Sequence, residues 1–335
     1  MLQRNSTTIW IGILGMFLLI TDSRTAIESV SGAIDLCIQS LIPAIFPFLI
    51  CSMVLTGSLG TSSLPLLWPL ESLVRIPEGS GIFLLMGYLG GYPVGAQNVS
   101  LAYSRGQLSK EDASRMIPFC NNAGPSFIFG VLGGLLGTMR DCWFLWLIHI
   151  LASLISAMMM PGTPGKFRNT RESKPLSLSK ILSKSIATMA NICGWVILFR
   201  LLLAYLEKLI MGVLPLSLRV LFSGILELAN GCIFLNQLND PCLRFILASG
   251  MLGFGGLCVA LQTKSLCSDL SLRLYFPGKI LHGCVSMIHS YFYCYLTYKK
   301  TVPLPWLILP VMIILPVISL LWTKNSSSIP APSGV

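Results

Sequence analysis

Charged side chains are scarce in this sequence. Only 11% of its 335 residues are Asp, Glu, Lys or Arg, whereas 54% are hydrophobic and the mean hydropathy is +0.76. Because a soluble domain carries about 25% charged residues, most of them on its surface, this composition excludes an ordinary soluble globular protein. It predicts a chain that crosses a lipid bilayer several times.

Signatures of common chemistries are also missing. The 11 cysteines lie mostly in apolar runs without CxxC spacing, and the 3 histidines have no HExxH or Asp-rich partner, so we expect no metal site, disulfide framework or cofactor. No Ser lies in a GxSxG elbow, and the spacing of Glu227 to His149 or His282 gives no support to an intramembrane enzyme. We therefore expect that the protein is not an enzyme.

The net charge of +10 is the one feature that could suggest nucleic acid. No basic block with interleaved aromatic residues accompanies it, so we expect no nucleic-acid partner. The positive-inside rule and contact with anionic lipid explain the excess of Lys and Arg instead.

Long apolar stretches are what the sequence does contain. A spanning helix needs about 20 apolar residues. The stretches predict an all-α, polytopic membrane protein with about 8–10 membrane segments, some broken or re-entrant, in the cell membrane. They occupy residues 8–22, 34–56, 79–102, 115–137, 142–160, 185–206, 218–236, 242–261, 279–297 and 303–322.

A basic stretch at residues 161–184 divides the chain into two weakly similar halves. It contains several Lys and Arg residues but only one acidic residue, Glu172, and this excess of positive charge predicts a cytoplasmic loop. On each side the order is an apolar helix, a Gly-rich segment, a broken segment and an aromatic-rich helix, an internal repetition typical of transporters. The predicted units are an N-terminal transmembrane helix and connection (1–33), a first membrane repeat (34–160), the basic cytoplasmic loop (161–184), a second membrane repeat (185–297), a C-terminal transmembrane helix (298–323) and a disordered tail (324–335).

Two adjacent amides interrupt the segment at residues 115–137. Pro118 and Pro125 each remove a backbone donor and free a carbonyl one turn earlier, and such groups must be buried in protein or face a wet cavity. Asn side chains offer both donors and acceptors, so they suit solute binding. The alternative is an Asn pair that only satisfies its own kink. The predicted solute-binding residues here are Asn121, Asn122, Gly124, Pro125 and Ser126.

An acidic residue, Glu227, lies in the middle of another apolar segment. A carboxylate there costs a few kcal/mol on insertion scales, so it should face a partner, a cavity or a proton path. Asn230, three residues on, shares its helix face. We expect Glu227 to couple H+ or Na+ and Asn230 to contact solute. The alternative is an inert ion pair between Glu227 and Arg200.

Glycines recur every four residues at Gly87, Gly91 and Gly95, the spacing that lets helix backbones touch. Packing explains the glycines themselves. The polar pair Gln97 and Asn98 follows directly, and we add both to the predicted solute-binding residues.

Four of these blocks carry a family resemblance: GGYPVGA at 90–96, FCNNAGPSFIFG at 119–130, LELANG at 226–231 and GFGGL at 253–257. The chain resembles the sporulation integral membrane proteins of the YlbJ type, which are related to nucleoside-recognition, or Gate-domain, membrane proteins. The resemblance implies a spore-forming Gram-positive bacterium, a role in spore cortex formation, and the mother-cell or forespore membrane as location. It also implies a distant likeness to concentrative nucleoside transporters, whose helical hairpins and unwound helices hold the substrate. After GFGGL, where relatives are expected to have Ser and His, this chain has Cys258 and Ala260.

Two functions remain open from the sequence. The first is a transporter-like protein that binds a small polar solute, nucleoside-like or related to the cell wall, together with H+ or Na+. The second is a non-transporting membrane scaffold that recruits cortex-building proteins through the basic loop. The lipid bilayer is a partner in both, and a homo-oligomeric state is left open.

Overall fold

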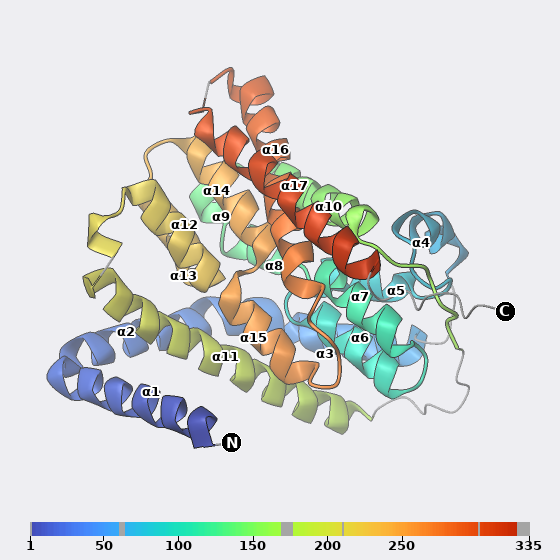
Figure 1. Cartoon of the computed structure of the whole chain (residues 1–335), viewed down its shortest axis with the longest axis horizontal. Coiled ribbons are helices and arrows are strands. Elements are labelled where there is room, and N and C mark those ends of the chain that lie inside the picture. The colour runs from blue at the N-terminus through green and yellow to red at the C-terminus, as the bar shows by residue number, and fades with distance from the viewer. Residues whose placement is uncertain (1, 60–63, 169–176, 210, 301, 327–335) are drawn as a thin grey trace.

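The chain folds into helices and connecting loops, as a computed structural model shows (Figure 1). The structure describes residues 2–59, 64–168, 177–209, 211–300 and 302–326. Four helical stretches in these ranges are long and apolar enough to cross a membrane, and shorter apolar helices accompany them. The polytopic all-α fold is therefore confirmed. The four stretches are Ser23–Leu55, Met139–Met159, Leu178–Leu209 and Pro241–Leu266.

The N-terminal region is an angled pair of helices. Helix α1 (Leu2–Thr21) meets α2 (Ser23–Leu36) at Asp22, whose side chain caps α2 by accepting from the Thr25 amide. A π-helical turn (Cys37–Leu41) then leads into α3 (Ile42–Leu59), so the predicted boundary at 33/34 falls inside a helix. Gly32 lies inside α2 next to that point and does not interrupt the helix.

The predicted segment 79–102 is two helices rather than one. Helices α5 (Gly81–Gly90) and α6 (Val94–Ser104) pack against each other as a hairpin, and its turn contains Gly91, with φ +77°, and a cis peptide bond before Pro93. We call α5 and α6 the first hairpin. The connection before it contains a 3-10 turn (Pro65–Leu67) and α4 (Trp68–Val74).

The predicted break after residue 120 is present. The chain leaves the helical conformation between α7 (Lys110–Cys120) and α8 (Pro125–Gly130), with Asn121 and Gly124 extended. The short α9 (Gly133–Leu136) and the long α10 (Met139–Met159) complete this half.

The second half has the same order of elements. Helix α11 (Leu178–Leu209) is followed by a hairpin of α12 (Leu216–Leu226) and α13 (Leu228–Phe234), which we call the second hairpin. Next come two helices separated at Gly255, and then two long helices. These are α14 (Pro241–Phe254), α15 (Gly256–Leu266), α16 (Tyr275–Tyr298) and α17 (Pro305–Ser326), with 3-10 turns at Met211–Val213 and Leu235–Gln237.

The N-terminal end of the basic loop is held by contacts with the first half. The backbone amide of Arg168 donates to the carbonyl of Gln107, and that of Gly165 donates to the Asp112 carboxylate. Helix α11 begins at Leu178, so Lys180 and Lys184, predicted as loop residues, lie in its exposed first turns. Residues 169–176 of the predicted loop and most of the predicted tail, 327–335, lie outside the described residues.

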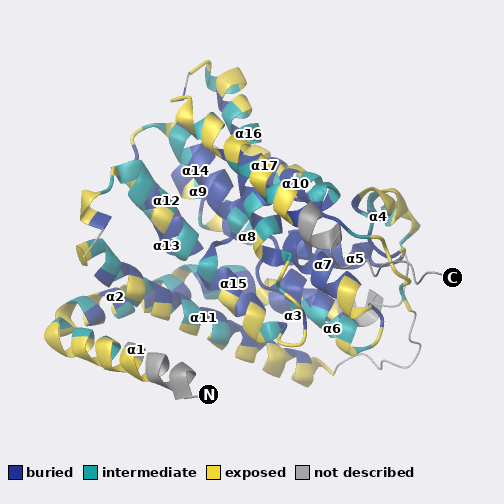
Figure 2. Ribbon diagram, in the orientation of Figure 1, coloured by how far each residue is buried: buried dark blue, intermediate teal, exposed yellow. Residues whose placement is uncertain are grey.

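Long helices on two sides enclose the broken ones. Figure 1 shows α2 and α11 side by side along one side and α16 and α17 along the other, with α8, α13 and α15 between them. Figure 2 shows exposed residues along α1 and α17, whereas α5, α7 and α14 are largely buried. The exposed positions of the outer helices include many large apolar residues, such as Trp10, Phe17 and Leu315. These side chains face lipid in a protein that spans a bilayer.

Candidate functional site

Each hairpin touches the broken helix that follows it. A Cβ atom added to Gly91, in the turn of the first hairpin, would lie 2.9 Å from the backbone nitrogen of Gly124. A Cβ atom added to Gly256 would lie 3.3 Å from the backbone nitrogen of Leu228, in the turn of the second hairpin. The two hairpin turns and the two helix breaks therefore come close together inside the protein, although they are far apart in the sequence.

A small cavity of about 40 Å³ lies where these four irregular segments meet. This space is enough for a few water molecules, whereas a pocket for a drug-sized solute measures about 300–1,000 Å³. The polar groups that border the cavity come from both halves of the chain. The residues that line it are Leu41, Ile45, Gly90, Gly91, Tyr92, Gly124, Ser126, Phe127, Ile192, Val196, Glu227, Leu228, Ala229, Val259 and Gln262.

The Glu227 carboxylate lies at the turn of the second hairpin and is 2% exposed. It caps α13, because it accepts hydrogen bonds from the backbone amides of Ala229 (3.0 Å) and Asn230 (2.7 Å). The Asn230 side-chain amide donates to the same carboxylate over 2.6 Å, as their spacing of three residues predicts. Among the described residues, Arg200 forms no ion pair with Glu227; its guanidinium lies over the Phe234 ring.

The Asn pair lies at the C-terminal end of α7, fully buried. Asn121 donates to the hydroxyls of Thr263 and Tyr275, over 2.8 Å and 3.2 Å. Asn122 donates to the Phe119 carbonyl over 2.6 Å, the contact expected of an amide that satisfies its own kink. Neither Asn side chain lines the cavity.

Lys279 is the polar group at the break that the sequence prediction missed. It is fully buried, and its ammonium donates to the backbone carbonyl of Asn121 and contacts Asn122 and Tyr92. Because Lys279 begins an apolar segment, it is easily taken for an interfacial residue. The sequence does contain a signal for a buried polar face, because polar residues recur at helical spacing at Lys279, His282, Ser286 and Ser290. All four are buried in the structure.

Tyr92 connects this cluster to the second half of the chain. Its hydroxyl donates to the Leu252 carbonyl over 2.6 Å. In an uninterrupted helix that carbonyl would accept from the amide of residue 256, but the helix is broken at Gly255, where φ is +84°. The first hairpin therefore supplies the donor that the break in the second half requires.

Two histidines complete the buried polar cluster. The Nε2 atom of His149 accepts from the backbone amide of Ala123 over 3.0 Å, which satisfies an amide freed by the break. The His282 ring lies 4.5 Å from that of His149, and its Nε2 atom lies 2.9 Å from the His149 carbonyl. The described residues contain no group of three or more His, Cys, Asp or Glu that could hold a metal ion.

The predicted site residues thus fall into distinct places. Gly124, Ser126 and Glu227 line the cavity, whereas Pro125 starts α8 without lining it. Gln97 donates to the Thr188 hydroxyl and Asn98 to the Ser52 hydroxyl, so both bridge neighbouring helices. At the positions that depart from the resemblance, Cys258 accepts from the buried Gln262, and Ala260 is buried.

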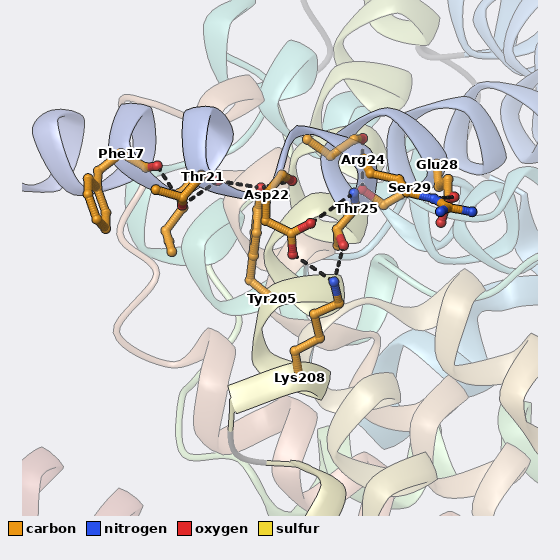
Figure 3. A network of polar contacts seen from close by, with 11 residues as sticks. Phe17, Thr21, Asp22, Arg24, Thr25, Glu28, Ser29, Tyr205 and Lys208 are labelled. Atoms are coloured by element: carbon orange, nitrogen blue, oxygen red, sulfur yellow. Dashed lines mark hydrogen bonds and ion pairs between the residues drawn. The ribbon is translucent and has the colours of Figure 1, made fainter.

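A second polar network joins the α1–α2 corner to the end of α11 (Figure 3). The Lys208 ammonium donates to the Asp22 carboxylate over 2.6 Å and also to the Thr25 hydroxyl, and the Tyr205 hydroxyl donates to the carbonyls of Leu18 and Asp22. The hydrogen bonds from Lys208 and Thr25 hold the pKa of Asp22 below its ordinary value of 3.8. This network fixes α1 and α2 against α11, away from the cavity.

The long apolar helices, together with the shorter apolar ones, define a multi-pass α-helical integral membrane protein. The chain is 25% identical to the sporulation integral membrane protein YlbJ of Bacillus subtilis (strain 168), over 80% of this chain and 78% of the relative. The chain is therefore similar to a sporulation integral membrane protein over most of its length. No family model and no solved structure matches the chain, and its relation to Gate-domain proteins stays a prediction.

Proposed function

We propose that this chain is a transporter-like protein of the cell membrane, needed for spore cortex formation, which binds a small polar solute where its hairpin turns meet its broken helices. The observation that carries the proposal is one cavity lined from both halves, with Ser126 and Tyr92 from the first and Glu227 and Gln262 from the second. Transporters built from repeats place their solute at such a junction. The similarity to a sporulation membrane protein supports the role in sporulation.

The small cavity represents a closed state in this proposal. A nucleoside-like or cell-wall-related solute needs several times the observed 40 Å³. The second hairpin moves away from Gly256 to admit it, and the hairpin then exposes the amides and carbonyls of its turn. Glu227 holds the coupling ion, H+ or Na+, because its buried carboxylate lies at that turn.

Single substitutions in sporulating cells test this function. Glu227→Gln and Asn122→Ala should insert at normal levels yet strongly reduce the yield of heat-resistant spores with a normal cortex in electron micrographs. Glu28→Gln and Asn236→Ala are matched controls at exposed positions and should behave like the unaltered protein. If both intramembrane variants make normal cortex, the solute-binding proposal fails and the scaffold function of the basic loop takes its place.

Uptake measurements define the solute. The purified chain in proteoliposomes is offered radiolabelled nucleosides and cell-wall precursors, with a proton or a sodium gradient imposed separately. Accumulation driven by one gradient, and lost in Glu227→Gln, is the expected result. Accumulation that Glu227→Gln leaves unchanged would refute coupling at this residue.

A further inference from the structure

An ammonium group fills the end of the broken helix α7. Lys279, from the first turns of α16, donates to the carbonyl of Asn121, the residue that caps α7 at its C-terminus. Its Nζ atom lies 3.3 Å from the Tyr92 hydroxyl and 3.5 Å from the Asn122 amide oxygen. It also lies 4.9 Å from the centroid of the Tyr92 ring. No carboxylate among the described residues pairs with Lys279.

The three oxygen atoms around Lys279 act as hydrogen-bond acceptors. Tyr92 uses its only hydroxyl hydrogen on the Leu252 carbonyl, and Asn122 directs its amide nitrogen to the Phe119 carbonyl. The Asn121 carbonyl can only accept. Three acceptors match the three N–H groups of an ammonium, and none of them could donate to the lone pair of a neutral amine.

This set of groups is also of the kind that binds an alkali cation. The C-terminal end of a helix carries partial negative charge, and unwound backbone carbonyls coordinate Na+ in transporters with broken helices. The hydroxyl, the amide oxygen and the face of an aromatic ring add further attraction for a cation. All of these groups are neutral, so a single monovalent cation is enough to satisfy them.

We propose that Lys279 is a built-in cation in a site whose oxygen atoms would otherwise bind a sodium ion. The ammonium holds the end of α7, the turn of the first hairpin and, through Tyr92, the break in α14–α15 in one arrangement. The protein therefore needs no sodium ion at the α7–α8 break. The consequence for transport rests on the proposed function: Na+ coupling at this break is excluded, which leaves coupling to Glu227.

Thermal unfolding of the full purified chain in lipid nanodiscs tests the proposal without any solute. All proteins in this test carry Glu227→Gln, so that sodium bound at Glu227 cannot contribute. With Lys279 intact, this protein should unfold at the same temperature in NaCl, KCl and choline chloride of equal concentration. Lys279→Ala should unfold several degrees lower in KCl and choline chloride, and NaCl should restore the loss with a saturable concentration dependence, as binding to the native state requires. Lys264→Ala, at an exposed position of α15, is the matched control and should show neither effect.

A second variant separates a cation site from simple loss of packing. Lys279→Gln fills the space with a neutral amide, so we expect a smaller loss than in Lys279→Ala and no response to sodium. The proposal is overturned if sodium specifically stabilises the Glu227→Gln protein with Lys279 intact, if the Lys279→Ala protein responds equally to all three salts, or if neither Lys279 variant folds in NaCl. Sodium rescue of Lys279→Ala, together with normal cortex in both Glu227→Gln and Asn122→Ala cells, would uphold this site and refute the proposed function.

Discussion

Gly95 of the first hairpin lies against the carbonyl oxygen of Cys120, so closely that a Cβ atom added to Gly95 would fall 1.7 Å from that oxygen. A Cβ atom added to Gly87 would fall 1.8 Å from the same oxygen. The two glycines therefore enclose the last residue of α7, directly before the Asn pair. The glycine repeat serves helix packing here, and this packing positions the break.

Gly95→Ala should therefore displace α7 from the first hairpin. No rotamer can relieve the clash, because the atom that the new methyl group meets is backbone, and overpacking of this kind costs about 1–3 kcal/mol or more. We expect a lower unfolding temperature in nanodiscs and loss of cortex. Gly194→Ala is the control, since nothing lies within 4 Å of a Cβ atom at that helical position; equal stability of the two variants would contradict the observed packing.

Asn230→Ala should weaken the cap of α13. The substitution removes one of three donors to the Glu227 carboxylate, and a hydrogen bond to a charged group contributes about 1.5–3 kcal/mol. Unfolding temperatures of the two single variants and of the double variant with Glu227→Gln provide a thermodynamic cycle. Because the residues are in contact, the two effects should be less than additive. Additive effects would show that the contact contributes nothing.

The sequence is enough to predict the broken helices but not their arrangement. Pro118, Pro125 and the amides between them indicate an interrupted helix by local chemistry alone, and the spacing of Glu227 and Asn230 predicts their contact. The hairpin at Gly91 was missed although Gly90, Gly91 and Pro93 favour a turn, because the recurrence of Gly87, Gly91 and Gly95 was interpreted as helix packing. A turn that faces water usually contains charged or polar residues. The turn at Gly91 contains few of them, because it packs against the backbone of Gly124 inside the protein.

The long-range partners were out of reach for a similar reason. Lys279 and Tyr92 are 187 residues apart, and only the folded chain shows that they share one site. Gln97 and Asn98 were predicted to bind solute because this polar pair directly follows the glycine repeat. The sequence does not show that the amide of Gln97 donates to the Thr188 hydroxyl and that of Asn98 to the Ser52 hydroxyl.

His149→Leu should destabilise the α7–α8 break. The Ala123 amide then loses its acceptor in a buried position, and an unsatisfied buried donor costs about 1–3 kcal/mol. His289→Leu is a suitable control, because the His289 ring lies 2.8 Å from a carbonyl of its own helix, that of Val285, and bonds no group at the break. Thermal unfolding in nanodiscs measures both. A His149 variant as stable as the control would show that the Ala123 amide finds another acceptor.

The Asp22–Lys208 contact should depend on pH in a predictable direction. The pKa of Asp22 is lower in the folded protein than its ordinary value of 3.8, chiefly through the hydrogen bonds from Lys208 and Thr25. The carboxylate therefore stabilises the α1–α2 corner fully above its unfolded pKa, and this contribution is lost as the pH falls through the lowered folded pKa. Asp22→Asn should be less stable than the unaltered protein near neutral pH, by a small amount because the pair is solvent-exposed.

The difference in stability between the two proteins is measured by calorimetry in nanodiscs from pH 7, above the ordinary pKa of 3.8, down to about pH 2. It should stay constant from neutral pH to about pH 5 and disappear at the acid end. Glu28→Gln, which disrupts the exposed Arg24–Glu28 pair of α2 and leaves the Asp22–Lys208 pair in place, controls for a general change in surface charge. A difference that persists at the lowest pH would mean that Asp22 stabilises the corner as a neutral cap of α2, without a contribution from the charge of Lys208.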